Sequence, residues 1–321
     1  MQALVYDRYG PPEVLARRDM PIPAPAEDEV RVEVHAAALN SWDWDLLVGS
    51  PLIRLFGPLR PPHPILGCDL AGRVVEVGAR VQRLQVGDEV FGDNSGGRWG
   101  ALAEYACARE DMLAIKPREI SFAVAAALPQ AGVLALQGLR LRGGIESGHR
   151  VLIEGAGGGV GTMALQMAKA RGAYVACVDR AEKRDRLLAL GADQVFDYER
   201  EDYTRDRDGF DLVLDVVGRR SLFAHRRALR DGGVYVMAGG TIPRLLQHAS
   251  LGPVVSLFGS KKLRILVHRP NVADLEELAA RVVSGELRPV IDRECALDAL
   301  PQAFRDLGAG RVLGKVVASL R

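Results

Sequence analysis

The sequence predicts an α/β protein in which a doubly wound parallel sheet is joined to a second, mainly antiparallel β domain. Two patterns lead to this prediction. Up to about residue 120, short stretches alternate apolar and polar residues between Gly and Pro, which is typical of half-buried strands. From about residue 121 to 260, apolar strands alternate with helical segments, which indicates a parallel sheet covered by helices on both faces. The length of 321 residues is about right for two such domains.

In the first region, the clearest strand is the alternation of Val30, Val32 and Val34 with polar or charged residues. Successive side chains of a strand point to opposite faces, so these valines would all face the core. The end of the chain is expected to return to this region. Further expected elements are strands at 72–77, 89–91, 102–106 and 312–318 and an amphipathic helix at 272–283.

The second region begins with the apolar strand that ends at Glu154. Helical spacing follows it, and Gly191 ends the second helix in the way that a glycine commonly does. We therefore expect a sheet domain at residues 121–267, and a β domain made of residues 1–120 and 268–321. The expected strands are 151–154, 174–178, 194–196, 211–215 and 234–238, with helices that end near 171 and cover 181–190 and 221–230.

Composition disfavours several classes of protein. The formal net charge of +1 gives no field that would gather nucleic acid or anionic membrane. The first residues lack the basic start and apolar core of a signal peptide, and no apolar run reaches the roughly 20 residues that a membrane helix needs. The four cysteines are widely separated. We expect a cytoplasmic protein that acts on a small molecule, with no nucleic-acid or membrane partner.

The strongest chemical signal is the glycine cluster in VLIEGAGGGVGTMALQMAKARGAYVACVD, where a strand runs into a helix. The free N–H groups and partial positive charge of a helix N-terminus suit a pyrophosphate. In the best register, Gly158 lets the backbone approach the phosphate and Gly161 lets the helix pack on the strand. The alternative, in which the glycines form a turn with no ligand, is less favoured because the cluster lies between a predicted strand and a predicted helix and Asp179 ends the next strand. The candidate residues for a dinucleotide are Ala156, Gly158, Gly159, Val160 and Gly161.

The residues after the next strand leave the choice of cofactor open. Asp179 would accept hydrogen bonds from the ribose hydroxyls of NADH and repel the 2′-phosphate of NADPH. Arg180 and Lys183 would instead hold that phosphate. Two later turns, at Val217–Gly218 and at Ala238, Gly239 and Gly240, lie at the carboxyl end of the predicted sheet, where ligands bind in such folds.

A series of blocks runs in a fixed order along nearly the whole chain: LNSWDWDLL, HPILGCDLAGRVVEVGARV, VGDEVFG, GALAEYA, AALPQAGVLALQGL, GAGGGVG, LGADQVFDY and GKVV. In this order they resemble the zinc-independent medium-chain dehydrogenases/reductases, in the quinone oxidoreductase (zeta-crystallin-like) branch. The resemblance implies a GroES-like β domain made from both chain ends and a Rossmann domain between them. It also implies NADPH as the cofactor of many members, Tyr198 beside the adenosine and Lys315 near the cofactor.

The zinc alcohol dehydrogenases share this fold, so the metal ligands discriminate between the two branches. By resemblance, the zinc enzymes place a Cys where this chain has Asn40 and a His-Glu pair where it has Cys68 and Asp69. No Cys stands near Pro129–Gln130 for the third ligand. We therefore expect no metal, and a zinc-type alcohol dehydrogenase is the disfavoured alternative.

Without a Lewis acid, hydride transfer suits an electron-poor acceptor such as a quinone or an α,β-unsaturated carbonyl. Asn40 matches the family asparagine near the nicotinamide and would donate a hydrogen bond to the substrate oxygen. Asp43, Tyr105 and Gln130 are further catalytic candidates. A nicotinamide-binding regulatory or structural protein with little turnover is the alternative from another class.

Members of the family commonly pair through the edge of the Rossmann sheet, so the resemblance implies a homodimer. The apolar stretch 245–258 lies near that edge in the sequence. It would be buried either in such an interface or in the core of the domain.

Overall fold

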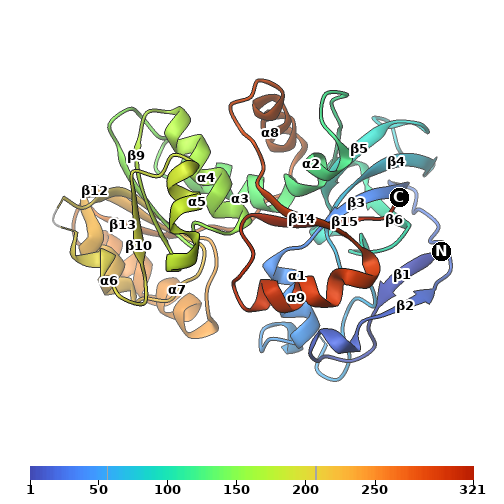
Figure 1. The fold of residues 1–321 in the computed structure, drawn as a ribbon, viewed down its shortest axis with the longest axis horizontal. Coiled ribbons are helices and arrows are strands. Elements are labelled where there is room, and N and C mark those ends of the chain that lie inside the picture. The colour runs from blue at the N-terminus through green and yellow to red at the C-terminus, as the bar shows by residue number, and fades with distance from the viewer. Residues whose placement is uncertain (56, 207) are drawn as a thin grey trace. The chain divides into compact units, whose positions relative to one another are not determined.

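The computed structural model describes residues 1–55, 57–206 and 208–321, and the described chain divides into two compact units (Figure 1). One unit comprises residues 1–133, 270–285 and 289–321, and the other comprises residues 134–269 and 286–288. The first unit is thus assembled from both sides of the second in the sequence. We describe each unit by itself.

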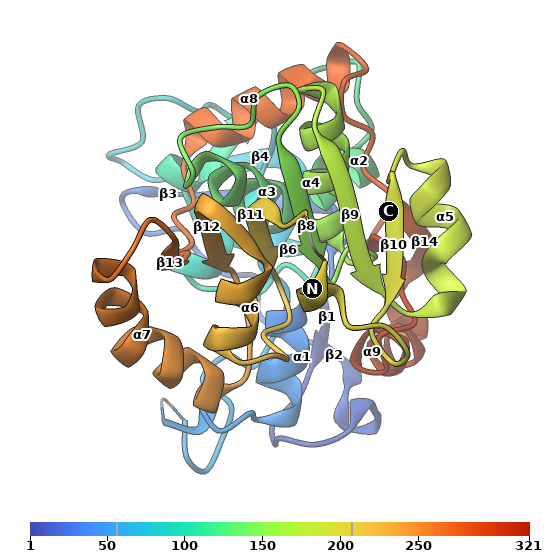
Figure 2. The same ribbon diagram turned by 90° about the vertical axis from the view of Figure 1, so that its left-hand side faces the viewer.

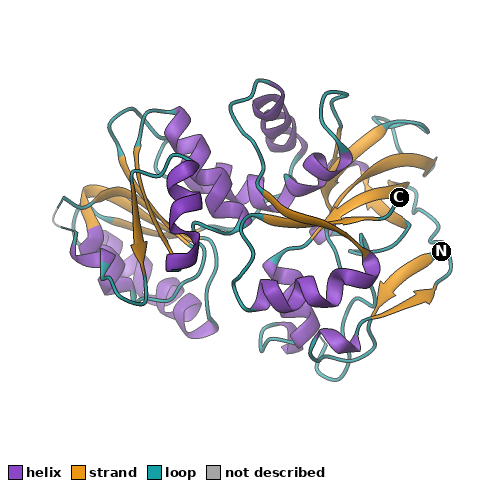
Figure 3. Ribbon diagram, viewed as in Figure 1, coloured by secondary structure: helices purple, strands orange, loops and turns teal. Residues whose placement is uncertain are grey.

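The first unit contains a seven-stranded, mainly antiparallel sheet (Figure 3). Its strand order is β14-β15-β3-β4-β5-β7, and β6 also pairs with β3. A separate antiparallel pair, β1 (Gln2–Val5) and β2 (Ala16–Asp19), accompanies it. The strands of the large sheet are β3 (Glu29–Ala38), β4 (Asp69–Val77), β5 (Glu89–Asp93), β6 (Tyr105–Arg109), β7 (Leu113–Ile115), β14 (Ile291–Ala296) and β15 (Lys315–Ser319).

Both ends of the chain contribute to the core of this unit. The predicted alternation on β3 is confirmed, since Val30, Val32 and Val34 are fully buried. Phe304 and Val316, from the end of the chain, belong to the same apolar cluster. The helices of the unit are α1 (Ser41–Val48), α2 (Phe122–Ala127), α8 (Val272–Val283) and α9 (Leu300–Gly308), together with the first residues of α3 (Pro129–Arg140).

The second unit is a six-stranded parallel sheet in the order β10-β9-β8-β11-β12-β13 (Figure 2). The order reverses direction at β8, which is the doubly wound arrangement. Right-handed crossovers therefore put the helices of the two halves on opposite faces. The strands are β8 (Arg150–Glu154), β9 (Tyr174–Asp179), β10 (Gln194–Asp197), β11 (Phe210–Asp215), β12 (Leu229–Met237) and β13 (Lys262–Ile265), and the helices are α4 (Gly159–Ala170), α5 (Arg184–Ala189), α6 (Leu222–Ala228) and α7 (Ile242–Leu257).

Three expectations about the fold differ from the structure. Residues 121–133 belong to the first unit rather than to the sheet domain, because α2 packs on β3 and β4. The strand expected at 102–106 begins at Tyr105, since the backbone of Leu102 instead donates a hydrogen bond to Leu66 and accepts one from Leu4. Of the two places expected for the stretch 245–258, the core is contradicted, because the stretch is largely an exposed helix with Leu257 80% exposed, and the interface stays a prediction.

No helix among the described residues combines the length and the apolar character that a membrane crossing requires.

A buried carboxylate fixes the start of α1. Asp43 accepts hydrogen bonds from the backbone N–H groups of Asn40 and Gly67, each at 2.8 Å. These bonds satisfy one free donor at the helix N-terminus and join the helix to the segment before β4. Burial raises the pKa of Asp43 to about 7, against the pull of these two N–H groups.

Asp43→Asn is expected to weaken the pH dependence of stability. Because the pKa of Asp43 is higher in the folded state, its contribution is present at low pH and is lost as pH rises from about 4 to about 7. In urea unfolding, the free energy of unfolding should therefore fall less between pH 5 and pH 8 in the variant than in the wild type. Asp306→Asn is the control, since a hydrogen bond from Arg311 lowers the pKa of Asp306, so its titration lies below this range and the variant should keep the wild-type change between pH 5 and pH 8. Equal pH dependence in wild type and Asp43→Asn would contradict this assignment.

Candidate active site

The glycine cluster forms the turn from β8 into α4, in the register that the sequence predicts. A Cβ atom on Gly161 would lie 2.4 Å from the Cα atom of Ala156, so only glycine fits where α4 packs on the turn. At Gly158, by contrast, the nearest atom to such a Cβ is a backbone oxygen at 3.5 Å. Gly159 and Val160 begin the first turn of α4 beside this open position. The backbone here can accept a close ligand.

Asp179, at the end of β9, is tied to this turn. Its carboxylate accepts hydrogen bonds from the backbone N–H of Gly157 at 2.6 Å and of Arg180 at 2.9 Å. The ammonium group of Lys183 lies 3.4 Å from the same carboxylate, and both side chains are nearly buried. The negative charge of Asp179 is therefore largely balanced within the protein.

Tyr198 contacts two further cationic side chains, those of Arg180 and Arg219. The side-chain Nε of Arg180 donates to the Tyr198 hydroxyl at 3.0 Å. The guanidinium of Arg219 lies over the Tyr198 ring, 4.1 Å from its centre. Sequence reasoning singled out Tyr198 and Arg180 but missed Arg219. Its position directly after the turn that ends β11 was the available signal, because that turn lies at the carboxyl edge of the sheet.

The two later turns pack against each other. A Cβ on Gly218 would lie 2.7 Å from the Cα of Gly240, and one on Gly239 would lie 2.5 Å from a backbone oxygen. The amides of Val217 and Gly218 are already used, since both donate to the Asp215 carboxylate, at 2.9 and 2.7 Å. Ala238 likewise donates its amide to the Asp215 carbonyl. These turns therefore offer shape and carbonyl groups to a ligand rather than free amides at Val217 and Gly218.

Asp215 belongs to a buried polar cluster that sequence reasoning missed. The Nε2 atom of His225 lies 3.2 Å from Glu154 and 3.5 Å from Asp215. Tyr203 donates to Glu154, and Tyr235 donates to Asp215 at 2.7 Å. Burial, and next the charge of Glu154, raises the pKa of Asp215 to about 6. The signal in the sequence was an acidic residue at the end of each of two apolar strands.

Two members of the cluster directly precede glycine-containing turns. Glu154 ends β8, before the turn into α4, and Asp215 ends β11, before the turn at Val217–Gly218. Its three potential metal ligands lie close together, yet hydrogen bonds within the protein already engage each ligand atom. The arrangement explains how the turns are held and does not require an ion.

In the first unit, the structure brings together three of the predicted residues. Lys315 donates to the Asn40 side-chain oxygen at 2.5 Å and to Asp69 at 3.0 Å. The side-chain amides of Asn40 and Gln130 both point to the sulfur of Cys68, at 3.4 and 3.5 Å. All five side chains are buried. We call Asn40, Cys68, Asp69, Gln130 and Lys315 the amide cluster.

By the resemblance described above, Asn40, Cys68 and Asp69 stand where the zinc enzymes have metal ligands, and the chemistry of the amide cluster does not favour a zinc ion. Cys68, Asp69 and Asp93 do bring three potential ligand atoms together. The ammonium of Lys315 already bonds to Asp69, so a divalent cation would meet a positive charge. Burial, and next the charge of Asp93, raises the pKa of Cys68 well above its usual value, which opposes the thiolate that zinc requires.

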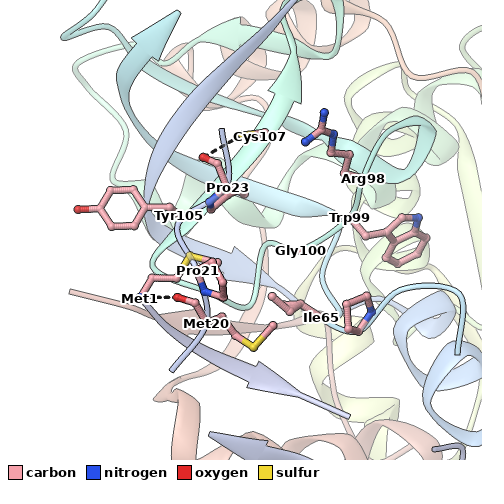
Figure 4. Close-up of a pocket in the computed structure, with 12 residues that line it drawn as sticks. Met1, Met20, Pro21, Pro23, Ile65, Arg98, Trp99, Gly100, Tyr105 and Cys107 are labelled. Carbon is pink, nitrogen blue, oxygen red and sulfur yellow. Dashed lines mark hydrogen bonds between the residues drawn. The ribbon is translucent and has the colours of Figure 1, made fainter. Parts of the chain in front are cut away.

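Two predicted residues lie outside the amide cluster. Asp43 is bound to backbone N–H groups, as described above, and serves the start of α1. Tyr105 pairs with Glu33 on β3, seven residues before Asn40, which places it about 20 Å away along an extended strand. It instead lines an apolar pocket of about 180 Å³ with Met20, Pro23 and Trp99 (Figure 4). The structure does not support Tyr105 as a catalytic residue.

Comparison with known proteins agrees with this architecture. Residues 26–118 match the alcohol dehydrogenase GroES-like domain, and residues 190–317 match the zinc-binding dehydrogenase model. The chain is 35% identical to the 2-methylene-furan-3-one reductase of Solanum lycopersicum, over 99% of this chain and 78% of that protein.

Solved structures give the same picture. The quinone oxidoreductase from Coxiella burnetii matches with a TM-score of 0.89 and 31% identity, over 100% of this chain and 99% of that one. The Escherichia coli quinone oxidoreductase complexed with NADPH matches with a TM-score of 0.86 and 27% identity, over 99% and 100% of the two chains. The chain therefore belongs to the medium-chain dehydrogenase/reductase family, among the relatives of the quinone oxidoreductases.

Proposed function

We propose that the protein is a zinc-independent NAD(P)H-dependent oxidoreductase that reduces quinones or α,β-unsaturated carbonyls. The observation that carries the proposal is the open glycine turn at the start of α4, which belongs to a chain related to quinone and enone reductases. A 2-methylene-furan-3-one is itself an α,β-unsaturated ketone, so the names of both relatives refer to electron-poor acceptors.

The second unit would hold the cofactor. The pyrophosphate would lie at Gly158 and the first turn of α4, where backbone N–H groups and the helix dipole favour an anion. The adenosine end would reach Asp179 and Tyr198, and the packed turns at Gly218 and Gly240 would border the rest. When bound, the nicotinamide supplies the hydride.

The amide cluster would act on the substrate. The Asn40 side chain carries two N–H donors, and one of them is directed to Cys68. The other would donate to the substrate oxygen, where negative charge develops as hydride adds. No metal would take part, because Lys315 supplies the positive charge next to Asp69.

The purified protein should oxidise NADPH or NADH when 1,4-benzoquinone or an enone is added, followed by absorbance at the nicotinamide band. Asn40→Ala should lower kcat on the order of 100-fold, the effect of removing one oxyanion donor. A metal chelator should leave the rate unchanged. Asn271→Ala is the matched control, since Asn271 also precedes a helix and caps it without belonging to the amide cluster.

Other results would redirect the proposal. Saturable cofactor binding without oxidation of either nucleotide by several acceptors would favour a regulatory nicotinamide-binding protein. Loss of activity with chelator, together with about one zinc per chain, would favour the zinc-type alcohol dehydrogenase.

We also propose a preference for NADPH. Asp179 would repel a 2′-phosphate, but Lys183 and two backbone N–H groups already balance its charge. Arg180 and Arg219 add two guanidinium groups around Tyr198. The local excess of positive charge would suit a phosphate.

Lys183→Ala should therefore lower kcat/KM for NADPH about 10- to 100-fold more than for NADH, since a hydrogen bond to a charged group contributes about 1.5–3 kcal/mol. Lys169→Ala is the control, because Lys169 forms a similar pair with Asp193 on another part of the unit. A wild-type protein that prefers NADH, or a Lys183 variant with an unchanged ratio, would speak against this preference.

We further propose a homodimer through the β13 edge of the sheet. Among the described residues, α7 and the residue after it expose an apolar group next to this edge, with Leu246, Leu257 and Phe258 each more than 60% exposed. Surface patches of this kind commonly mark interfaces.

The cytoplasmic location stays a prediction.

Sedimentation equilibrium should give a mass of two 34.7 kDa chains, and Leu257→Glu should yield the monomer. Leu188→Glu, at an exposed leucine on α5, should leave the dimer intact. A monomeric wild type would refute the pairing.

A further inference from the structure

Lys315 is bound in a way that the sequence did not indicate. The family resemblance placed it near the cofactor, but its side chain is only 3% exposed. Its ammonium bonds to the Asn40 oxygen at 2.5 Å and to Asp69 at 3.0 Å. Two of its three hydrogens are therefore used inside the amide cluster.

These contacts fix which way the Asn40 amide faces. An asparagine side chain can rotate by half a turn and exchange its oxygen and nitrogen. Lys315 has only donors, so it can donate to the side-chain oxygen of Asn40 but cannot bond to the side-chain nitrogen, which is itself a donor. With the oxygen held, one N–H reaches Cys68 at 3.4 Å and the second N–H is left to donate elsewhere.

The other members of the cluster support the same orientation. Gln130 donates its backbone N–H to Asp69 at 3.0 Å and its side-chain amide to Cys68 at 3.5 Å. Asp69 is thereby fixed between Gln130 and Lys315. Cys68 stays an uncharged thiol, because burial raises its pKa, so its sulfur accepts the Asn40 N–H without a competing charge.

We propose that Lys315 is a positioning residue for catalysis: by holding the oxygen of Asn40, it presents an amide N–H of Asn40 to the developing oxyanion of the substrate. Without Lys315 the amide would be free to flip and to present its oxygen, which repels that charge. The inference rests on the proposed function, in which Asn40 is the oxyanion donor, and assigns Lys315 a role through Asn40 rather than on the cofactor.

A double-mutant cycle tests this role. Lys315→Met keeps the length of the side chain and removes its donors, and should lower kcat about 10-fold or more while the KM for NADPH changes less than about twofold. Lys315→Met combined with Asn40→Ala should be no slower than Asn40→Ala alone, because residues that act as one unit are not additive. Independent, multiplying losses would overturn the proposal, as would a raised KM for NADPH with unchanged kcat.

A matched lysine controls for the loss of a buried charge. Lys116 is 6% exposed and bonds to Glu89 and to the backbone oxygens of Pro117 and Ile120, away from the amide cluster. Lys116→Met should keep the wild-type kcat. If Lys315→Met does not fold because Asp69 loses its partner, Asp69→Asn with Lys315→Met removes both charges and should show the same loss of kcat.

A second readout needs neither cofactor nor turnover. In the ¹⁵N–¹H spectrum of the free protein, the Asn40 side-chain amide is identified by its absence from Asn40→Ala. It should give two sharp signals in the wild type and in Lys116→Met, of which the one from the N–H bonded to Cys68 is protected from exchange, and broadened or unprotected signals in Lys315→Met. Unchanged signals in Lys315→Met would overturn the proposal. An ordered amide in a wild type that reduces no acceptor would instead reject the proposed function and leave the positioning intact.

Discussion

The ammonium of Lys315, enclosed with the carboxylate of Asp69, is the contact on which the arrangement of the first unit depends. It joins β15, at the end of the sequence, to the start of β4 and to Asn40, the residue immediately before α1. A buried ion pair of this kind adds little to the free energy of unfolding compared with apolar residues of the same size. Removing one partner alone, however, lowers the free energy of unfolding by about 3–5 kcal/mol. We expect the pair to contribute to specificity, because an arrangement of these segments that separates the two side chains leaves a buried charge without its partner.

The second unit uses carboxylates in a comparable way. Asp179 and Asp215 each end a buried strand, and each accepts the backbone N–H of a glycine in a turn at the carboxyl edge of the sheet. The glycines make the tight turns sterically possible, and the carboxylates select one conformation among those that glycine allows. A ligand therefore meets a turn that is already ordered, which lowers the entropy cost of binding.

Much of this architecture could be predicted from the sequence because its signals are local. The helix over 272–283 was expected at the observed bounds, since its apolar stripe is regular. The parallel strands and the register at Gly158 and Gly161 followed from apolar runs and glycine spacing. The strand placed at 102–106 began too early, because the segment before Tyr105 has the same apolar character but pairs irregularly.

The arrangement of the site was much less accessible. Asn40 and Lys315 are 275 residues apart, so no periodicity or motif indicates that they share a hydrogen bond. Tyr105 had suitable chemistry but lies toward the other end of the strand that precedes Asn40. The cluster of Glu154, Asp215 and His225 went unnoticed because its members come from three different elements. Such contacts depend on tertiary packing, which cannot be predicted from the local patterns of a single sequence.

The interrupted layout of the first unit also sets an order of events on the ribosome. Residues 134–269 emerge after Asp69 and before Lys315, and domains generally fold as they are made. While the second unit is being synthesised, Asp69 has no ammonium partner, and its burial is opposed by the cost of desolvating a lone charge. We therefore expect the amino-terminal segment to stay incompletely folded until β15 has been made, and the amide cluster to be complete only then.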